Sequence, residues 1–216
     1  MFLNIEYALI GDIMKKLLDK LFNVDKKVLL FLFIISFIGL LTGAIYMTVL
    51  DSGDKIQVSE TLSGFLQVAQ PENYIESLTN NLIINLLSIF FIWILGLSVI
   101  GLPVVIFFIF LKSFVVSFSL SSFIANYQLK GTLLGFVYNF PHHFINLVIY
   151  IYLGVYAIKV SSLLFTAIVK RKNVDFKVIM NRYLLVLCIS LFIVVIMTII
   201  ETFLTPYLLK ISVSVL

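Results

Sequence analysis

Two ionisable side chains, Lys112 and Glu201, interrupt apolar stretches that are long enough to cross a membrane. An ionisable group inside a bilayer is costly, so it normally marks a functional site. At about 1.5 Å per helical residue, Lys112 lies about 13 Å past Pro103, and Glu201 lies about 28 Å past Arg182. Because a lysine can extend its charge along apolar surface, an ion pair between Lys112 and Glu201 is feasible but stretched. A proton or ion pathway would need more such groups stacked through the membrane.

The adjacent residues His142 and His143 are the other candidates for chemistry. Metal ligands on one face of a helix sit three or four residues apart, whereas neighbours face different sides. The pair is therefore predicted to be an interfacial cap after Pro141. The sequence contains no HExxH motif, no GxSxG motif and no phosphate-binding glycine loop. It thus predicts a protein that is not an enzyme and that holds no catalytic residue, metal or cofactor.

The composition is that of an integral membrane protein. Of the 216 residues, 62% are hydrophobic and 12% are charged, whereas a soluble domain is about half apolar and about a quarter charged. Five apolar blocks predict an all-α, polytopic helical bundle. The single cysteine, Cys188, excludes an internal disulfide.

The predicted organisation is a basic amino-terminal segment, 1–27, followed by one transmembrane domain, 28–216. A crossing needs about 20 apolar residues. Translation can start at Met1 or at Met14, which is followed at once by two lysines. Five full spans are predicted near 28–50, 78–97, 103–124, 142–169 and 183–204.

A tight reversal is predicted between the second and third spans. Residues 82–111 contain no charge and are too many for one untilted span. Gly96 and Gly101 permit the backbone angles of a reversal, and Pro103 suits the first turn of the outgoing helix. The alternative is one long helix kinked at Pro103.

A shorter apolar segment, 131–140, cannot cross a membrane alone, because it extends only about 15 Å as a helix. It is predicted to be a half-helix, either re-entrant or lying at the interface. Irregular backbone at membrane depth must be covered by protein. A sixth full span is the alternative.

The charges predict the orientation. Basic residues precede the first span and recur in the loop 170–182, which is therefore predicted to be cytoplasmic together with the amino terminus. The carboxyl terminus and the loop 51–77 are predicted to be extracytoplasmic. That loop supplies a candidate docking surface for a partner, because complementary charge fixes orientation. Its acids are Asp51, Asp54, Glu60, Glu72 and Glu76.

Several motifs together resemble the stage II sporulation protein M family. They are IWILGLSVIGLP at 92–103, FLK at 110–112, RY at 182–183 and ETFLTPYLLK at 201–210. The resemblance covers about 80–210 and is most specific in the glycine and proline hairpin. Ser113 stands where the family usually has glycine, and Pro141 with the two histidines matches a proline followed by polar residues.

The resemblance implies a non-enzymatic scaffold in a bacterial cell membrane. Such a protein recruits or stabilises two peptidoglycan hydrolases, stage II sporulation proteins D and P, at the septal and engulfing membrane during sporulation. The expected surroundings are the lipid bilayer and these partners, with no nucleic acid, and homo-oligomerisation is left open. The alternative function is a small transporter or channel with its site near Lys112 and the half-helix 131–141, where a broken helix would lie.

Overall fold

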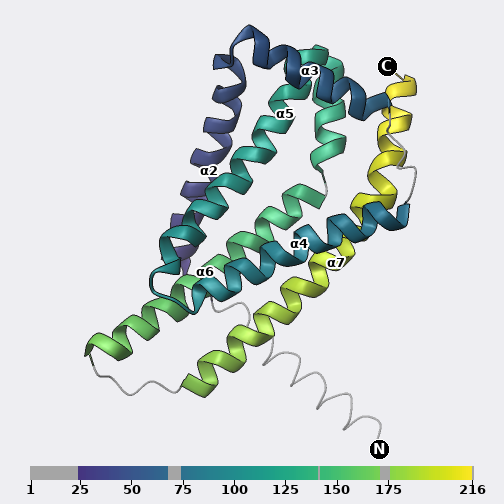
Figure 1. Cartoon of the computed structure of the whole chain (residues 1–216). Coiled ribbons are helices and arrows are strands. Elements are labelled where there is room, and N and C mark those ends of the chain that lie inside the picture. The colour runs from purple at the N-terminus through teal and green to yellow at the C-terminus, as the bar shows by residue number, and fades with distance from the viewer. Residues whose placement is uncertain (1–23, 68–73, 141, 171–175, 216) are drawn as a thin grey trace, which may run out of the picture.

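The computed structural model describes residues 24–67, 74–140, 142–170 and 176–215, and these ranges are helical apart from short turns (Figure 1). Five of the six described helices, all except α3, are long and apolar enough to cross a membrane. The prediction of an all-α polytopic bundle is therefore confirmed. The helices are α2 (Lys26–Val49), α3 (Ser52–Gln67), α4 (Tyr74–Gly96), α5 (Gly101–Asn139), α6 (His142–Lys170) and α7 (Phe176–Val215).

The helices connect alternately at the two ends of the bundle (Figure 1). The start of α2, the turn between α4 and α5, the end of α6 and the start of α7 lie at the lower end in Figure 1. Helix α3 crosses the upper end, where the carboxyl-terminal end of α7 also lies. The chain therefore passes along the bundle five times.

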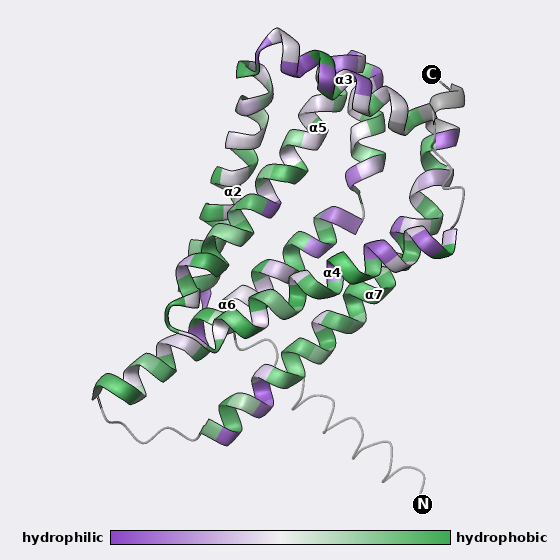
Figure 2. Cartoon of the chain, in the orientation of Figure 1, coloured by the Kyte–Doolittle hydropathy of each residue, from purple (hydrophilic) through white to green (hydrophobic). Residues whose placement is uncertain are grey.

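The outer surface is apolar along the bundle. Phe33, Val49 and Phe192 are 62%, 73% and 69% exposed. Figure 2 shows hydrophobic residues along the long helices and hydrophilic ones over α3. Such a surface suits acyl chains rather than water, since large contiguous apolar patches are rare on soluble monomers. The molecule is a multi-pass membrane protein.

Helices α2 and α5 approach each other closely at two glycines. A Cβ added to Gly39 would lie 2.6 Å from the carbonyl oxygen of Phe110, and one added to Gly43 would lie 3.0 Å from the backbone nitrogen of Phe118. This G-x-x-x-G spacing is a membrane helix-packing motif that the sequence analysis missed. Beside it, the hydroxyls of Ser36 and Ser113 are 2.8 Å apart.

The reversal between α4 and α5 occupies residues 97–100, and Pro103 lies in the first turn of α5. The expected reason for the glycines was wrong in one respect, because no described glycine has a positive φ. Close packing explains them instead. A Cβ on Gly96 would lie 2.6 Å from that of Ala157 on α6, and a Cβ on Gly101 would lie 2.8 Å from the carbonyl carbon of Leu95.

Helix α5 breaks at Gln128, where φ is 54° and ψ is −128°. Residues 129–139 form a half-helix that folds back onto the preceding segment. A Cβ on Gly135 would lie 3.0 Å from that of Phe123, and Leu134 is only 4% exposed. One face of the half-helix is therefore covered by protein, while Leu133 and Phe136 on its outer face stay exposed. Helix α6 continues from the half-helix towards the lower end (Figure 1). Together they form one broken passage along the bundle.

The helices extend beyond the predicted spans. The first segment of α5 continues past 124 to the break at Gln128, and residues 176–182, predicted as loop, are the first two turns of α7. Helix α7 also passes Leu204 and contains Pro206. The helices are longer than the predicted spans because helical hydrogen bonds join residues four apart and do not require apolar side chains. A helix can therefore continue into polar residues, whereas a span predicted from hydropathy ends at them.

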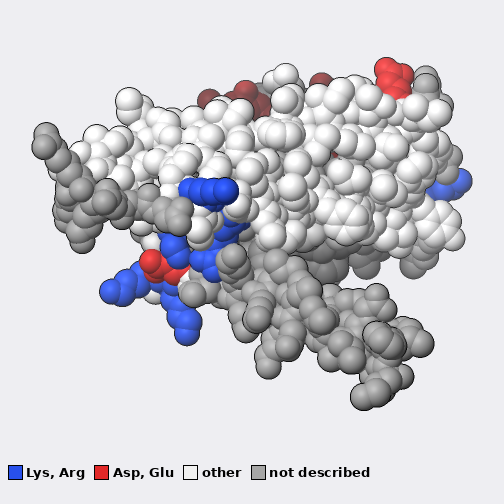
Figure 3. Space-filling model, turned by 90° about the horizontal axis from the view of Figure 1, so that it is seen from below, with Lys and Arg blue, Asp and Glu red and all other residues white. Residues whose placement is uncertain are grey.

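Charges separate between the two ends. Among the described residues, Lys26, Lys27, Lys177 and Arg182 lie on the first turns of α2 and α7, at the lower end. Figure 3, which views the molecule from below, shows Lys and Arg side chains gathered in a group at the centre left, with a further basic patch at the right edge. The acids on α3 lie at the other end.

Candidate functional site

A cavity of about 270 Å³, lined by both apolar and polar side chains, lies between α4, α5, α6 and α7. Both ionisable residues singled out in the sequence, Lys112 and Glu201, line it. The half-helix contributes Tyr138 and Asn139 where the passage is broken. The other lining residues are Asn81, Ile84, Asn85, Val115, Val116, Ser119, His143, Asn146, Leu147 and Tyr150.

The break in the chain positions the two histidines. The half-helix ends at Asn139, Phe140 is extended, and α6 begins at His142, so both imidazoles belong to a first helical turn. Their ring centroids are only 4.1 Å apart. The expectation that adjacent histidines face different sides was wrong, because no preceding helical turn constrains these rings. His142 is also only 1% exposed, which an interfacial cap would not be.

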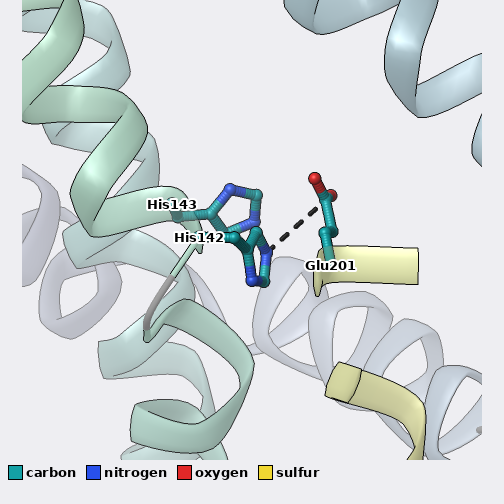
Figure 4. A group of neighbouring side chains, drawn as sticks. All are labelled: His142, His143 and Glu201. Atoms are coloured by element: carbon teal, nitrogen blue, oxygen red, sulfur yellow. Dashed lines mark ion pairs between the residues drawn. The ribbon is translucent and has the colours of Figure 1, made fainter. Parts of the chain in front are cut away.

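Glu201 meets these rings from α7. Its Oε1 lies 3.7 Å from Nε2 of His142, as the dashed line in Figure 4 marks. Its Oε2 accepts a hydrogen bond of 3.2 Å from Nδ2 of Asn85, which also donates to Oγ1 of Thr198 at 3.0 Å. Asn85 thus holds one carboxylate oxygen and leaves the other directed at the histidines.

His142 is held from its opposite ring nitrogen. Nδ1 lies 3.4 Å from Oγ1 of Thr205 on α7. In contrast, Nε2 is buried and has no hydrogen-bond partner among the described residues. The same is true of the Oδ1 atoms of Asn139 and Asn146, which line the cavity. Buried polar atoms are normally satisfied, so these three atoms without a hydrogen-bond partner are candidates for contact with a ligand or with water.

Lys112 supplies the positive charge of the cavity. Its Nζ lies 5.2 Å and 5.5 Å from the ring centroids of Phe108 and Tyr150, within the range of cation–π attraction. Lys112 and Glu201 line the same cavity, but the contact marked in Figure 4 joins the carboxylate of Glu201 to the imidazole of His142. The sequence suggested a stretched pair of two groups, whereas the structure assembles Lys112, Glu201 and both histidines.

The other candidates lie away from this cavity. Gly96, Gly101 and Pro103 form the reversal at the lower end. Asp51, Asp54 and Glu60 lie on or beside α3, and Glu76 lies in the first turn of α4, while Glu72 falls outside the described residues.

The comparison with protein families gives one result. The model of the family described as stage II sporulation protein M matches residues 29–206. The chain belongs to this family. Comparison with curated proteins gave no match, and comparison with solved structures gave none.

Membership of the stage II sporulation protein M family makes this chain a sporulation-related membrane protein. Glu201, both histidines and Lys112 all fall inside the matched range. The family match extends the resemblance to the first span, where the sequence alone gave little.

Sequence reasoning missed the convergence at the cavity, although signals for it existed. Asn81 and Asn85 are four apart on an apolar helix and therefore share one face. Asn146 follows His142 by four residues and shares its face in the same way. Pro206 removes one backbone bond of α7 beside Thr205. Together these features indicate polar helix faces and an irregular backbone within apolar spans, which are the signals of a polar site inside the bundle.

Proposed function

We propose that the protein is a non-enzymatic membrane scaffold that gathers peptidoglycan hydrolases at the septal and engulfing membrane during sporulation. The observation that carries this proposal is the family match over residues 29–206. The proposed partners are stage II sporulation proteins D and P. The proposed orientation places the amino terminus and the basic end in the cytoplasm, and the acidic end and the carboxyl terminus outside, in keeping with the positive-inside rule.

The acidic end is the proposed docking surface. Asp51, Asp54 and Glu60 are exposed on or beside α3, so they can meet a basic surface without first breaking a buried contact. The apolar side of α3 is already used, since Leu62 and Leu66 pack against a buried cluster of Phe123, Leu134 and Leu209. A partner therefore meets the charged face of α3.

Co-purification from detergent-solubilised membranes tests the proposal. The tagged protein should retain both hydrolases, and a variant with the five acids of the outer segment neutralised should retain less of them, most clearly at low salt. The matched control neutralises Lys26, Lys27 and Lys177 at the opposite end and should leave hydrolase recovery unchanged. Equal recovery with the acidic variant, at equal amounts of inserted protein, would remove this end as the docking surface.

A second candidate function is passage of a small polar solute. It is favoured by one observation, the cavity at a broken helix lined by Lys112, Glu201 and two residues of the half-helix. Transporter sites are commonly built from discontinuous helices near the middle of the membrane. Flux of labelled solutes into vesicles containing the purified protein distinguishes the two functions. Flux that Lys112→Met abolishes would establish transport, whereas a scaffold leaves vesicles impermeable.

A further inference from the structure

We propose that His142, His143 and Glu201 form a binding site for a divalent transition-metal ion, with Zn²⁺ as the best-matched ion. One ligand atom from each residue lies within 4.8 Å of the others. Figure 4 shows the two imidazoles side by side at the start of α6, with the carboxylate of Glu201 approaching from α7. This site does not depend on the scaffold proposal.

The donor set suits Zn²⁺ and its neighbours. Imidazole nitrogen and carboxylate oxygen bind these ions at about 2.0–2.2 Å, so ligand atoms around a tetrahedral ion stand about 3.4 Å apart. Nε2 of His142 and Oε1 of Glu201 are 3.7 Å apart. Rotations of the side chains that move the ligand atoms by about 1 Å close the site. Two histidines and one carboxylate also leave positions open for a further ligand.

Two supporting contacts already orient the ligands as metal sites require. A ligating imidazole normally engages its other ring nitrogen with a partner, and Nδ1 of His142 lies 3.4 Å from Oγ1 of Thr205. Ligating carboxylates are likewise held by outer partners. Asn85 binds Oε2 of Glu201 and leaves Oε1 facing the histidines.

The unpartnered atoms give independent support. Nε2 of His142 is buried, directed at Glu201, and has no hydrogen-bond partner in the described part of the chain. The Oδ1 atoms of Asn139 and Asn146, which line the adjoining cavity, are in the same state. All three offer lone pairs rather than protons when Nδ1 of His142 carries the hydrogen, and a cation satisfies lone pairs.

Lys112 makes the site distinctive, because it places a positive charge on the wall of the same cavity. The positive charge of Lys112 repels a bound metal ion, so the affinity for the metal is lower while Lys112 is charged. Removing that charge should strengthen metal binding. If the histidines have only a structural role, removing the charge of Lys112 should not increase metal affinity. A substitution at Lys112 therefore distinguishes a metal site from a structural role.

Co²⁺ and Zn²⁺ titrations of the detergent-solubilised full chain test the site, using a tag without histidine. We expect one equivalent of Co²⁺ to give visible d–d absorption that Zn²⁺ displaces. His143→Asn and Glu201→Gln should weaken binding by more than 100-fold, beyond the 10- to 100-fold expected for Thr205→Val as a supporting partner. Glu60→Gln, an exposed carboxylate at the end of the bundle, is the matched control and should bind as the wild type does.

Lys112→Met completes the test and should bind Zn²⁺ more tightly than the wild type, with Lys159→Met as its control. If the wild type shows no saturable Co²⁺ band, the site does not exist. The proposal is equally overturned if His143→Asn, eluting as a monodisperse protein, binds metal as the wild type does. Should that variant fail to fold, an unchanged or weaker affinity in Lys112→Met overturns it instead.

Discussion

The contact between α2 and α5 yields the sharpest stability prediction, through Gly43→Ala. A Cβ at this position would overlap the backbone carbonyl of Phe114, and it would lie 3.0 Å from the backbone nitrogen of Phe118. Both obstacles are main-chain atoms of a regular helix, so no side-chain rotation relieves the overlap. The added methyl group must push α2 away from α5.

The net cost follows from two opposing terms. Overpacking of this kind costs about 1–3 kcal/mol. Replacing glycine with alanine inside a helix returns about 1 kcal/mol. Gly43→Ala should therefore destabilise the protein by up to about 2 kcal/mol. Gly39→Ala should act similarly, and because both residues share one seam, the double change should not be additive.

Gly53 and Gly64 on α3 provide matched controls, because a Cβ on either one meets nothing within 4 Å. Their replacement by alanine carries only the favourable helix term. The midpoint of thermal unfolding in one detergent, followed by the fluorescence of Trp93, should fall for Gly43→Ala and stay level or rise for Gly53→Ala. A midpoint for Gly43→Ala equal to or above that of Gly53→Ala would refute the close approach of the two helices.

Three further predictions concern the turns and the orientation. Gly101→Val should reduce the amount of protein accumulated in membranes, because its Cβ meets backbone atoms of the preceding helix; normal accumulation would make this glycine incidental. Gln128→Gly should raise the midpoint of thermal unfolding. The backbone angles at this position, φ of 54° and ψ of −128°, cost a non-glycine residue about 1–3 kcal/mol, which exceeds the roughly 0.5–1 kcal/mol entropic cost of glycine. A lower midpoint would contradict this reasoning. In a Cys188→Ser background, Ser52→Cys should react with an impermeant thiol reagent in intact cells and Val174→Cys should not; the opposite result would reverse the orientation.

The number and order of the long helices could be predicted from the sequence, because the hydropathy of each residue is known without the structure. Apolar runs locate the five long helices, and the uncharged stretch around Pro103 locates the reversal between α4 and α5. Helix ends could not be read in the same way. The residues of α7 before Tyr183 are polar enough to leave the membrane, yet the helix already begins at Phe176, since its hydrogen bonds need no apolar surroundings.

The site was beyond reach for a different reason. Lys112, Glu201 and the histidines lie on three helices, and their meeting depends on how far the half-helix folds back after Gln128. A periodicity rule for continuous helices separated His142 from His143, and it does not apply to the first turn after a break. Asn85 could be recognised as polar but not as the partner of Glu201, 116 residues away.

A scaffold that only presents an outer surface to its partners needs no polar groups in its interior. The buried polar groups of this protein lower its stability by an amount that can be measured. An unsatisfied buried polar atom costs about 1–3 kcal/mol, which is a large part of a total stability of about 5–15 kcal/mol. Oδ1 of Asn146 is buried and has no hydrogen-bond partner among the residues that the structure describes. Asn146→Leu, a change of similar volume, should therefore raise the unfolding midpoint of the metal-free protein. Ser190→Ala serves as the comparison, because the Ser190 hydroxyl on α7 is also buried without a hydrogen-bond partner among the described residues but does not line the cavity. A lower midpoint for Asn146→Leu would show that this amide already stabilises the empty bundle and that the cavity needs no occupant to explain it.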